Sequence, residues 1–210
     1  MKNLIIIGAG SFAKIVYEYA LLNPDYNIKW NVKGFIDPKI ESLKDETDYP
    51  EVISTIDDYI VEKDDIFICS YVNPVERERS VETISGRGGV FISIIHPSAN
   101  ISRKVILGEG VFIGAFTTLS VNTIIGNHVM IQDHCNVGHD SSIDDYSHLY
   151  VGNIICGKNK LGKKVTLYTG CTIYPIAKIG DNSIVGAGSV VMRNVKEGTT
   201  VIGNPAKKME

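Results

Sequence analysis

The chain carries two different patterns of hydrophobic positions, which meet near residue 95. Beyond that point an aliphatic residue recurs at every sixth position without a gap. The seventeen positions are Ile95, Ile101, Leu107, Ile113, Leu119, Ile125, Ile131, Val137, Ile143, Leu149, Ile155, Leu161, Leu167, Ile173, Ile179, Val185 and Val191. This spacing fits neither the 3.6-residue period of a helix nor the two-residue period of a strand. A six-residue period is typical of a parallel β-helix, in which three short strands close one triangular coil of about 18 residues.

The repeated aliphatic residue has regular companions. Glycine often follows it, and a small or β-branched residue usually stands two positions before it. The glycines are Gly108, Gly114, Gly126, Gly138, Gly162, Gly180 and Gly186. We expect the aliphatic side chains to point inward and stack from coil to coil, and the glycines to permit corners with positive φ. Residues 199–205 are expected to leave the β-helix and cap its open end.

Residues 1–94 alternate short apolar runs with amphipathic stretches. Leu4–Ile7 is a continuous apolar run, typical of a buried parallel strand, and a glycine turn and an amphipathic stretch up to Leu22 follow it. Further strands are expected to end at 34–36 and to cover 65–70 and 90–95, with a helix over 73–84. Alternating strands and helices favour an α/β fold. We therefore predict a Rossmann-like βαβ domain over residues 1–94 and a parallel β-helix over residues 95–210.

Composition excludes several classes of function. The formal net charge of the 210 residues is −3, which provides no basic field for nucleic acid or for an anionic membrane. No apolar run approaches the roughly 20 residues that span a bilayer, and the N-terminal run is too short for a signal peptide. The four cysteines show neither a CxxC pair nor a zinc-binding spacing. We expect a cytoplasmic protein with reduced thiols.

The turn after the first apolar run has the pattern GxGxxA, from Gly8 to Ala13. Backbone amides at a helix N-terminus hold phosphate groups, so Gly8, Gly10 and Ser11 are candidates for binding a diphosphate. Two alternatives stay open: a tight turn without a ligand, and a true dinucleotide site. Asp37 lies in a Phe-Ile-Asp-Pro sequence and is a candidate for contact with a nucleotide base or ribose, with a surface turn as the alternative.

Four segments of the chain carry a resemblance to a known family. They are GAGSFAK at 8–14, GFID at 34–37, VGHDSSIDDYSH at 137–148 and IGNPAK at 202–207. Together with the hexapeptide coils, they make the chain resemble the sialic acid O-acetyltransferases and sugar N-acetyltransferases, which include enzymes that acetylate UDP-linked 4-amino sugars in bacillosamine synthesis. The resemblance implies a left-handed β-helix, acetyl-CoA as cosubstrate and a nucleotide-linked amino sugar as acceptor. It also implies a homotrimer with active sites in the grooves between adjacent prisms.

Acetyl transfer from a thioester needs a base for the proton of the acceptor and a donor for the oxyanion of the tetrahedral intermediate. His139 is the candidate general base, because histidine side chains supply a neutral imidazole at pH 7. Asp140 would orient this ring or stabilise its charged form, which requires a corner or a partner chain, since adjacent residues on a strand point to opposite sides. Gly157 stands one full coil after His139. The resemblance implies that the Gly157 amide is the oxyanion donor; an exposed histidine and an ordinary corner glycine are the alternatives.

The resemblance also implies where coenzyme A binds. The candidate contacts are Thr169, Ala187 and Gly188, while Lys207 and Lys208 either meet phosphates or form a solvated basic tail. His148 follows His139 by half a coil, so the two would meet only across a subunit boundary. We give His148 a role in binding the acceptor or acetyl-CoA.

His134 is the rival candidate for the base, because it follows Asp133 and stands shortly before His139 in the chain. No two histidines stand one coil apart, as metal binding across neighbouring coils would require, so no metal site is predicted. The prediction is an enzyme that moves acetyl from acetyl-CoA to the amino group of a nucleotide-linked amino sugar by direct attack. A sugar or sialic acid O-acetyltransferase is the first alternative, and a non-catalytic β-helix that binds nucleotide sugars is the second.

Overall fold

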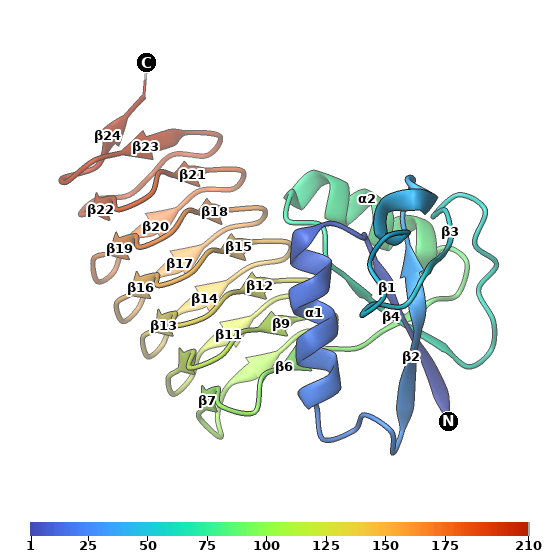
Figure 1. Ribbon diagram of the computed structural model, residues 1–210. Helices are drawn as coiled ribbons and strands as arrows, with labels where there is room; N and C mark the ends of the chain where they lie inside the picture. The colour runs from blue at the N-terminus through green and yellow to red at the C-terminus, as the bar shows by residue number, and fades with distance from the viewer. Residues whose placement is uncertain (210) are drawn as a thin grey trace. The chain divides into compact units, whose positions relative to one another are not determined.

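The computed structural model describes residues 1–209, which form two compact units. The first unit consists of residues 1–97 and the second begins at Ser98. In Figure 1 the first unit contains both α-helices, and the second is a stack of short strands. No helix within residues 1–209 is long and apolar enough to cross a membrane.

The first unit is built on a sheet of five parallel strands in the order β3-β2-β1-β4-β5. Its elements are β1 (Lys2–Ile7), α1 (Ser11–Leu22), β2 (Trp30–Ile36), the 3₁₀ helix η1 (Ile40–Leu43), β3 (Val52–Ser54), β4 (Asp65–Cys69), α2 (Pro74–Ser85), β5 (Val90–Phe91) and β6 (Ile94–Ile95). The central strand β1 has no exposed side-chain surface from Leu4 to Ile7, as expected for a strand covered on both faces. The order of the strands is that of the first five strands of a Rossmann fold.

Local sequence signals explain where these elements begin and end. The side chain of Asn73 caps α2 by accepting hydrogen bonds from the amides of Val75 and Glu76, at 2.9 and 3.3 Å, which confirms the predicted helix start. The single strand predicted over 90–95 is wrong, because the structure has two short strands there, β5 and β6. The short strand β3 was not predicted, since a run of this length leaves no periodic pattern.

The second unit is a triangular prism with three sheets, parallel throughout except at the C-terminal end of one of them. The β7 sheet contains β7 (Asn100–Ile101), β10 (Thr118–Leu119), β13 (Asn136–Val137), β16 (Ile154–Ile155), β19 (Thr172–Ile173) and β22 (Val190–Val191). The β8 sheet contains β8 (Ile106–Leu107), β11 (Ile124–Ile125), β14 (Ser142–Ile143), β17 (Lys160–Leu161) and β20 (Lys178–Ile179). Within this unit the β9 sheet contains β9 (Phe112–Ile113), β12 (Met130–Ile131), β15 (His148–Leu149), β18 (Thr166–Leu167), β21 (Ile184–Val185), β23 (Thr200–Ile202) and β24 (Lys207–Lys208). The chain turns between consecutive sheets, and we name the three edges of the prism by the sheets they join.

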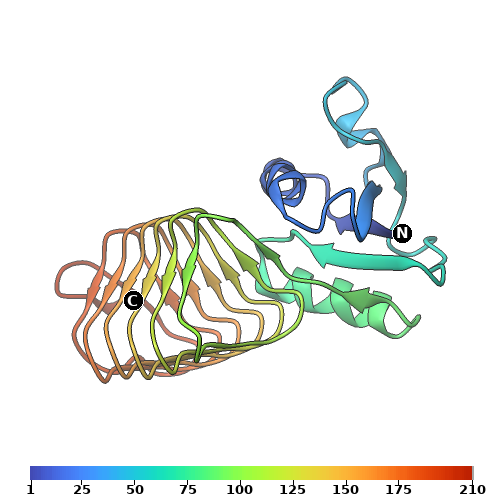
Figure 2. The same ribbon diagram turned by 90° about the horizontal axis from the view of Figure 1, so that it is seen from below.

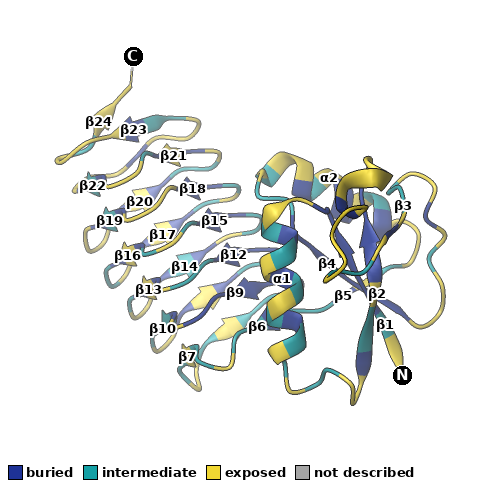
Figure 3. Ribbon diagram, viewed as in Figure 1, coloured by how far each residue is buried: buried dark blue, intermediate teal, exposed yellow. Residues whose placement is uncertain are grey.

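The repeated aliphatic residues form the core of the prism. Strands one coil apart pair in register, so that Leu119 of β10 lies beside Val137 of β13. From Ile113 to Val191 every repeated aliphatic residue is at most 2% exposed. Figure 2 shows successive coils following one another with the same outline, and Figure 3 shows buried and exposed residues alternating along each coil. The predicted coil of three short strands, with its predicted length, is therefore confirmed.

The glycines after the repeated aliphatic residues have a different role from the one we expected. Positive φ occurs three positions after the aliphatic residue, and most residues there are not glycine, as with His128 and Asp140 at φ 54°. The glycines instead allow consecutive coils to approach closely. A Cβ at Gly138, for example, would lie 2.7 Å from the Gly157 nitrogen in the next coil. The periodic glycine is thus required by contact between coils and not by the corner.

The C-terminal segment also differs from the expectation. Residues 199–205 do not leave the β-helix at once, because β23 pairs in parallel with β21 and continues the β9 sheet. The chain then turns back, and β24 pairs antiparallel with β23. The β9 sheet therefore ends in a hairpin.

Candidate active site

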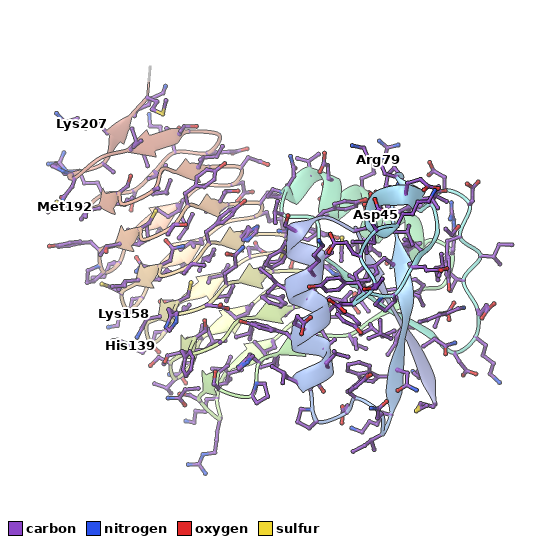
Figure 4. All side chains as sticks on the ribbon, in the orientation of Figure 1. Asp45, Arg79, His139, Lys158, Met192 and Lys207 are labelled. Atoms are coloured by element: carbon purple, nitrogen blue, oxygen red, sulfur yellow. The ribbon has the colours of Figure 1, made fainter. Side chains whose placement is uncertain are left out.

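His139 and Asp140 lie at a corner on the β7–β8 edge, between β13 and β14. Asp140 has φ 54°, a left-handed conformation that a short polar side chain tolerates better than most. Its amide donates to the carbonyl oxygen of Val121, 3.0 Å away in the preceding coil. Figure 4 shows His139 at the outer edge of the stack. The corner bends the chain so that two consecutive side chains can meet, which a straight strand would prevent.

The two side chains form a charge-assisted hydrogen bond. His139 Nδ1 lies 2.8 Å from Asp140 Oδ2, and the side chains are 54% and 44% exposed. Asn122 Nδ2 donates to the other carboxylate oxygen of Asp140 at 2.9 Å. These hydrogen bonds from His139 and Asn122 lower the pKa of Asp140 below its ordinary value, so the carboxylate stays ionised at neutral pH. With Nδ1 engaged by Asp140, the nitrogen that remains for chemistry is Nε2.

Gly157 lies beneath the ring of His139, in the next coil. A Cβ at Gly157 would fall 2.6 Å from His139 Nε2 and 2.8 Å from Cε1. The bare Cα of Gly157 therefore makes room for the ring in its observed position. The amide N–H of Gly157 makes no hydrogen bond to any residue in the described part of the chain. The structure thus brings together His139, Asp140 and Gly157, with a free ring nitrogen and an unbonded amide on the same edge.

Two further residues at this corner were missed by the sequence analysis. Asn122 and Lys158 lie one coil before and one coil after Asp140, at the same position of the repeat. Asn122 binds the carboxylate, and the charge of Lys158 contributes further to lowering the pKa of Asp140. The Lys158 amide donates to the carbonyl oxygen of His139 at 2.8 Å. Figure 4 shows Lys158 beside His139. Counting one full coil in both directions from Asp140 would have found both.

The candidate contacts for coenzyme A lie on a different edge of the same prism. Thr169 and Ala187 are one coil apart on the β9–β7 edge, and both are exposed. Gly188 has φ 65°, and its amide donates to the carbonyl oxygen of Thr169 at 2.9 Å. Within one chain these residues and His139 are therefore separated by the width of the β7 sheet.

His148 also lies away from His139 and Asp140 within one chain. It lies in β15, in the β9 sheet, and is fully buried. Its Nε2 lies 2.9 Å from Gln132 Nε2, and its ring stacks on that of Tyr150 with centroids 4.2 Å apart. Its predicted contact with the acceptor or acetyl-CoA stays a prediction.

His134, the rival base, stands at a corner on the β9–β7 edge. It is exposed, has φ 57° and stacks on the ring of Phe116 with centroids 5.2 Å apart. The neighbouring carboxylate of Asp133 accepts a hydrogen bond from the amide of Ala115 at 3.0 Å. The geometry therefore favours His139, whose ring is held by a carboxylate and lies above a bare amide.

The glycine turn of the first unit joins β1 to α1. Gly8 has φ 97°, and a Cβ there would lie 2.6 Å from Ser70 Oγ, so this position requires glycine. Gly10 is the N-cap of α1 and has no side chain with which to cap the helix, while a Cβ at Gly10 would meet nothing within 4 Å. Ser11 begins the helix and is exposed. Packing therefore does not require glycine at position 10, and there is free space beside the first residue of α1.

Asp37 has a structural function in the turn that the sequence did not indicate. Its Oδ2 accepts a hydrogen bond from the Ala9 amide at 2.9 Å, and its Oδ1 accepts one from the Lys39 amide at 2.8 Å. The hydroxyl of Tyr71 lies 3.4 Å from Oδ2. Burial and the charge of Asp37 raise the pKa of Tyr71. Asp37 is 9% exposed and holds the glycine turn in shape, so it is not part of a loose surface turn.

Comparison with known proteins shows to which family this chain belongs. Residues 3–84 match the family described as the PglD N-terminal domain. Over 167 residues the chain is 32% identical to the GDP-perosamine N-acetyltransferase of Escherichia coli O157:H7, a match that covers 69% of this chain and 67% of that enzyme. The chain belongs to the hexapeptide-repeat sugar N-acetyltransferase family.

Solved structures of related proteins resemble this sugar N-acetyltransferase along its whole length. One is a histidine-to-asparagine variant of perosamine N-acetyltransferase from Caulobacter crescentus, in complex with CoA and GDP-perosamine. It is 25% identical with a TM-score of 0.89, covering 100% of this chain and 98% of that chain. The acetyltransferase domain of PglB from Neisseria gonorrhoeae FA1090 is also 25% identical, with a TM-score of 0.89 and full coverage of both chains.

These findings confirm the predicted family, enzyme class and fold class. The sugar N-acetyltransferase has a Rossmann-like α/β region followed by a left-handed parallel β-helix, as the resemblance implied. Among residues 1–209 no group of three or more His, Cys, Asp or Glu side chains could hold a metal ion. The cysteines Cys69, Cys135, Cys156 and Cys171 are all free thiols.

Proposed function

We propose that the enzyme transfers acetyl from acetyl-CoA to the amino group of a nucleotide-linked amino sugar, with His139 as the general base. The relative from Escherichia coli acts on GDP-perosamine by its name, and the similar structure from Caulobacter crescentus holds CoA and GDP-perosamine. The observation that carries the mechanism is the position of the His139 ring, bound to Asp140 at Nδ1 and lying over Gly157 at Nε2.

The reaction needs no covalent enzyme intermediate. The amine nitrogen of the acceptor attacks the thioester carbonyl carbon, and a C–N bond forms as His139 Nε2 takes the amine proton. The carbonyl oxygen becomes an oxyanion and accepts a hydrogen bond from the Gly157 amide. The tetrahedral intermediate then collapses, the C–S bond breaks, and the imidazolium returns the proton to the departing thiolate of CoA. Atoms and charge balance with acetyl-CoA and the amine as the only reactants.

Asp140 and Asn122 support the base without touching the substrates. The Asp140 carboxylate fixes the tautomer of His139, because its oxygen accepts a hydrogen bond from Nδ1–H and leaves Nε2 with a lone pair. The same carboxylate stabilises the imidazolium that forms during the reaction. Asn122 donates to the second oxygen of Asp140, which favours the orientation of the carboxylate that faces the ring.

The nucleotide of the acceptor would lie at the start of α1. The helix has no side-chain cap at its N-terminus, and the N-terminus of a helix favours anions such as a diphosphate. The bare Gly10 lets a phosphate approach the backbone. Asp37 would act here by holding the turn through the Ala9 amide. Any contact of Asp37 with a base or ribose would come from the small part of its side chain that stays exposed.

A homotrimer would unite the two edges that one chain keeps apart. In that assembly the β9–β7 edge of one protomer, with Thr169, Ala187 and Gly188, would face the β7–β8 edge of its neighbour, with His139. The arm of coenzyme A would then run along small residues of one chain and deliver its thioester to the base of the other. We propose this arrangement on the separation of the edges described above.

The test is to incubate the enzyme with acetyl-CoA and a panel of GDP-, UDP- and dTDP-linked amino sugars while following release of free thiol. Each amino sugar is paired with the analogue that carries a hydroxyl in place of the amine. We expect turnover with an amine and not with its hydroxyl partner. Turnover with the hydroxyl sugars alone would establish an O-acetyltransferase instead. Absence of turnover and of CoA binding across the panel would favour a non-catalytic binding protein.

A further inference from the structure

Four corners of the prism, three on the β8–β9 edge and one on the β9–β7 edge, carry a cap that the corner of Gly157 on the β7–β8 edge lacks. At each, the first residue of the turn has its amide bonded to a side-chain oxygen of the residue one coil further on. The donor amides and their acceptors are Glu109 to Asn127, Ala115 to Asp133, Asn127 to Asp145, and Lys163 to Asp181, at 3.1, 3.0, 2.8 and 3.0 Å. The cap satisfies an amide that would otherwise point into solvent at the edge.

Each cap depends on a second residue, the glycine that precedes the donor amide. These glycines are Gly108, Gly114, Gly126 and Gly162. A Cβ at Gly108 or Gly126 would lie 2.6 Å from the capping oxygen, and one at Gly114 or Gly162 would lie closer still. A capped corner thus needs a glycine just before the donor and an Asn or Asp one coil later.

The corner of Gly157 has neither component. The residue before Gly157 is Cys156, which carries a Cβ at the position where, at the four capped corners, a Cβ would lie 2.0 to 2.6 Å from the capping oxygen. The residue one coil after Gly157 is Pro175, which carries no side-chain oxygen. Pro175 occupies the first position of its turn, as Asn127, Asp133 and Asp181 do in theirs. The amide of Gly157 accordingly makes no hydrogen bond to another residue in the range 1–209.

We propose that Cys156 and Pro175 are positioning residues that keep the Gly157 amide unbonded and available to the reacting carbonyl. This inference rests on the proposed function, in which that amide stabilises the oxyanion. A cap would compete with the oxyanion for a single N–H donor. The interaction matters in the transition state, where the charge develops, so sequestering the donor lowers kcat more than it changes the KM for acetyl-CoA.

The test converts this corner into a capped one. The double variant C156G/P175N imports both residue types found at the corner of Glu109, namely glycine before the donor and asparagine one coil later. Asparagine is chosen over aspartate so that no new charge is placed near His139. The matched control is C156G/P175A, which has the same glycine and also loses proline but offers no oxygen. The ratio of kcat between these two variants isolates the cap from loosening of the backbone.

We expect kcat of C156G/P175N to be at least about 10-fold below that of C156G/P175A, with similar KM values for acetyl-CoA and an equal or higher Tm. A crystal structure of C156G/P175N should place the introduced oxygen within the 2.8–3.1 Å of the Gly157 nitrogen that the four natural caps show. If Pro175 has a purely structural role, Tm and kcat should instead fall equally in both double variants. That result would overturn the proposal.

The crystal structure of the C156G/P175N variant separates the two ways in which the inference can fail. If the introduced oxygen does not reach the Gly157 amide, the proposed role of Cys156 and Pro175 is wrong, while the assignment of His139 and Gly157 is untouched. If the cap forms and the kcat ratio stays near one, the amide is not the oxyanion donor, and that part of the proposed function is wrong as well. The His139 variants described below test the base independently of both results.

Discussion

The ring of His139 covers the Cα of Gly157 so closely that a single added carbon at Gly157 would lie 2.6 Å from Nε2. A full coil of chain separates the two, yet they are neighbours because consecutive coils stack in register. The base and the proposed oxyanion donor are thus set at a fixed spacing by the β-helix itself, without a pocket built for the purpose.

Replacing Gly157 with alanine should displace the ring. The added Cβ takes the space of Nε2 and Cε1, so His139 must rotate away from the amide. We expect kcat to fall at least about 10-fold, since a misplaced base loses much of its contribution. The decisive measurement is a double-mutant cycle. In the His139→Ala background the same substitution should cost clearly less, because the ring that it displaces is absent. Equal losses in both backgrounds would show that the two residues act separately.

Removing the base tests the central assignment. His139→Ala should lose at least about 100-fold in kcat, the low end for a general base. His134→Ala is the matched control, because His134 is also an exposed corner histidine, but its ring stacks on Phe116 and no carboxylate among residues 1–209 holds it as Asp140 holds His139. It should retain kcat within about 3-fold of the parent enzyme, well short of the loss that removing a general base causes. Near-normal turnover of His139→Ala together with a loss in His134→Ala would move the base to His134.

The repeat made much of the prism predictable. One inward aliphatic residue in every six specifies both the coil length and which residues stack, so the neighbours His139 and Gly157 followed from subtraction. The role of the periodic glycines did not follow, because glycine answers two different demands, positive φ and absence of a Cβ. Only the backbone shows that Gly138 meets the second demand.

The support of the base by Asp140 should be measurable apart from the base itself. Asp140→Asn keeps the size of the side chain but removes the charge that fixes the ring, and we expect a loss in kcat smaller than that of His139→Ala. Because hydrogen bonds from His139 and Asn122 hold the pKa of Asp140 below its ordinary value, the parent carboxylate is ionised throughout the range from about pH 5 to 8. Because a histidine base itself changes charge within this range, parent and variant are compared at about pH 8, where the base is mainly neutral and the difference in kcat reports the lost charge of Asp140. Equal kcat values of parent and variant at that pH would contradict a supporting role for Asp140.

The carboxylate of Asp65 is expected to make the stability of the first unit depend on pH. Burial alone raises its pKa, but hydrogen bonds from the Glu62 amide, the Tyr59 hydroxyl and Asn3 and the charge of Lys33 outweigh burial and leave the pKa below its ordinary value. A lowered folded-state pKa contributes stability that is present above the unfolded-state pKa and is lost as pH falls through the folded-state value. Asp65→Asn should thus lower the free energy of unfolding at neutral pH. The difference from the parent should shrink as denaturation is repeated below about pH 4. A difference that stays constant far into the acid range would contradict this linkage.

Parts of the site lay beyond sequence reasoning for physical reasons. Asp37 was expected near a base or ribose, because a sequence pattern does not show which amide a carboxylate will bind; the structure shows it holding Ala9. Asn122 was missed because its partner, Asp140, is close only after the chain has completed a coil. His148 lies away from His139 within one chain, as its half-coil separation predicted, and Thr169 falls on another edge as well, because the position within the 18-residue coil fixes the side of the prism.

The left-handed residue at each corner has a consequence for how such proteins can change. Positive φ recurs at every sixth position from 110 to 188, in residues as different as Phe116, Tyr146, Lys164 and Ile176. The backbone therefore imposes this conformation with little regard to the side chain. Duplicating or deleting one whole coil elsewhere in the prism would leave the geometry of every remaining corner intact. Families of this design can lengthen or shorten by whole coils during evolution, provided that the three consecutive coils carrying Asn122, Asp140 and Lys158 are inherited together.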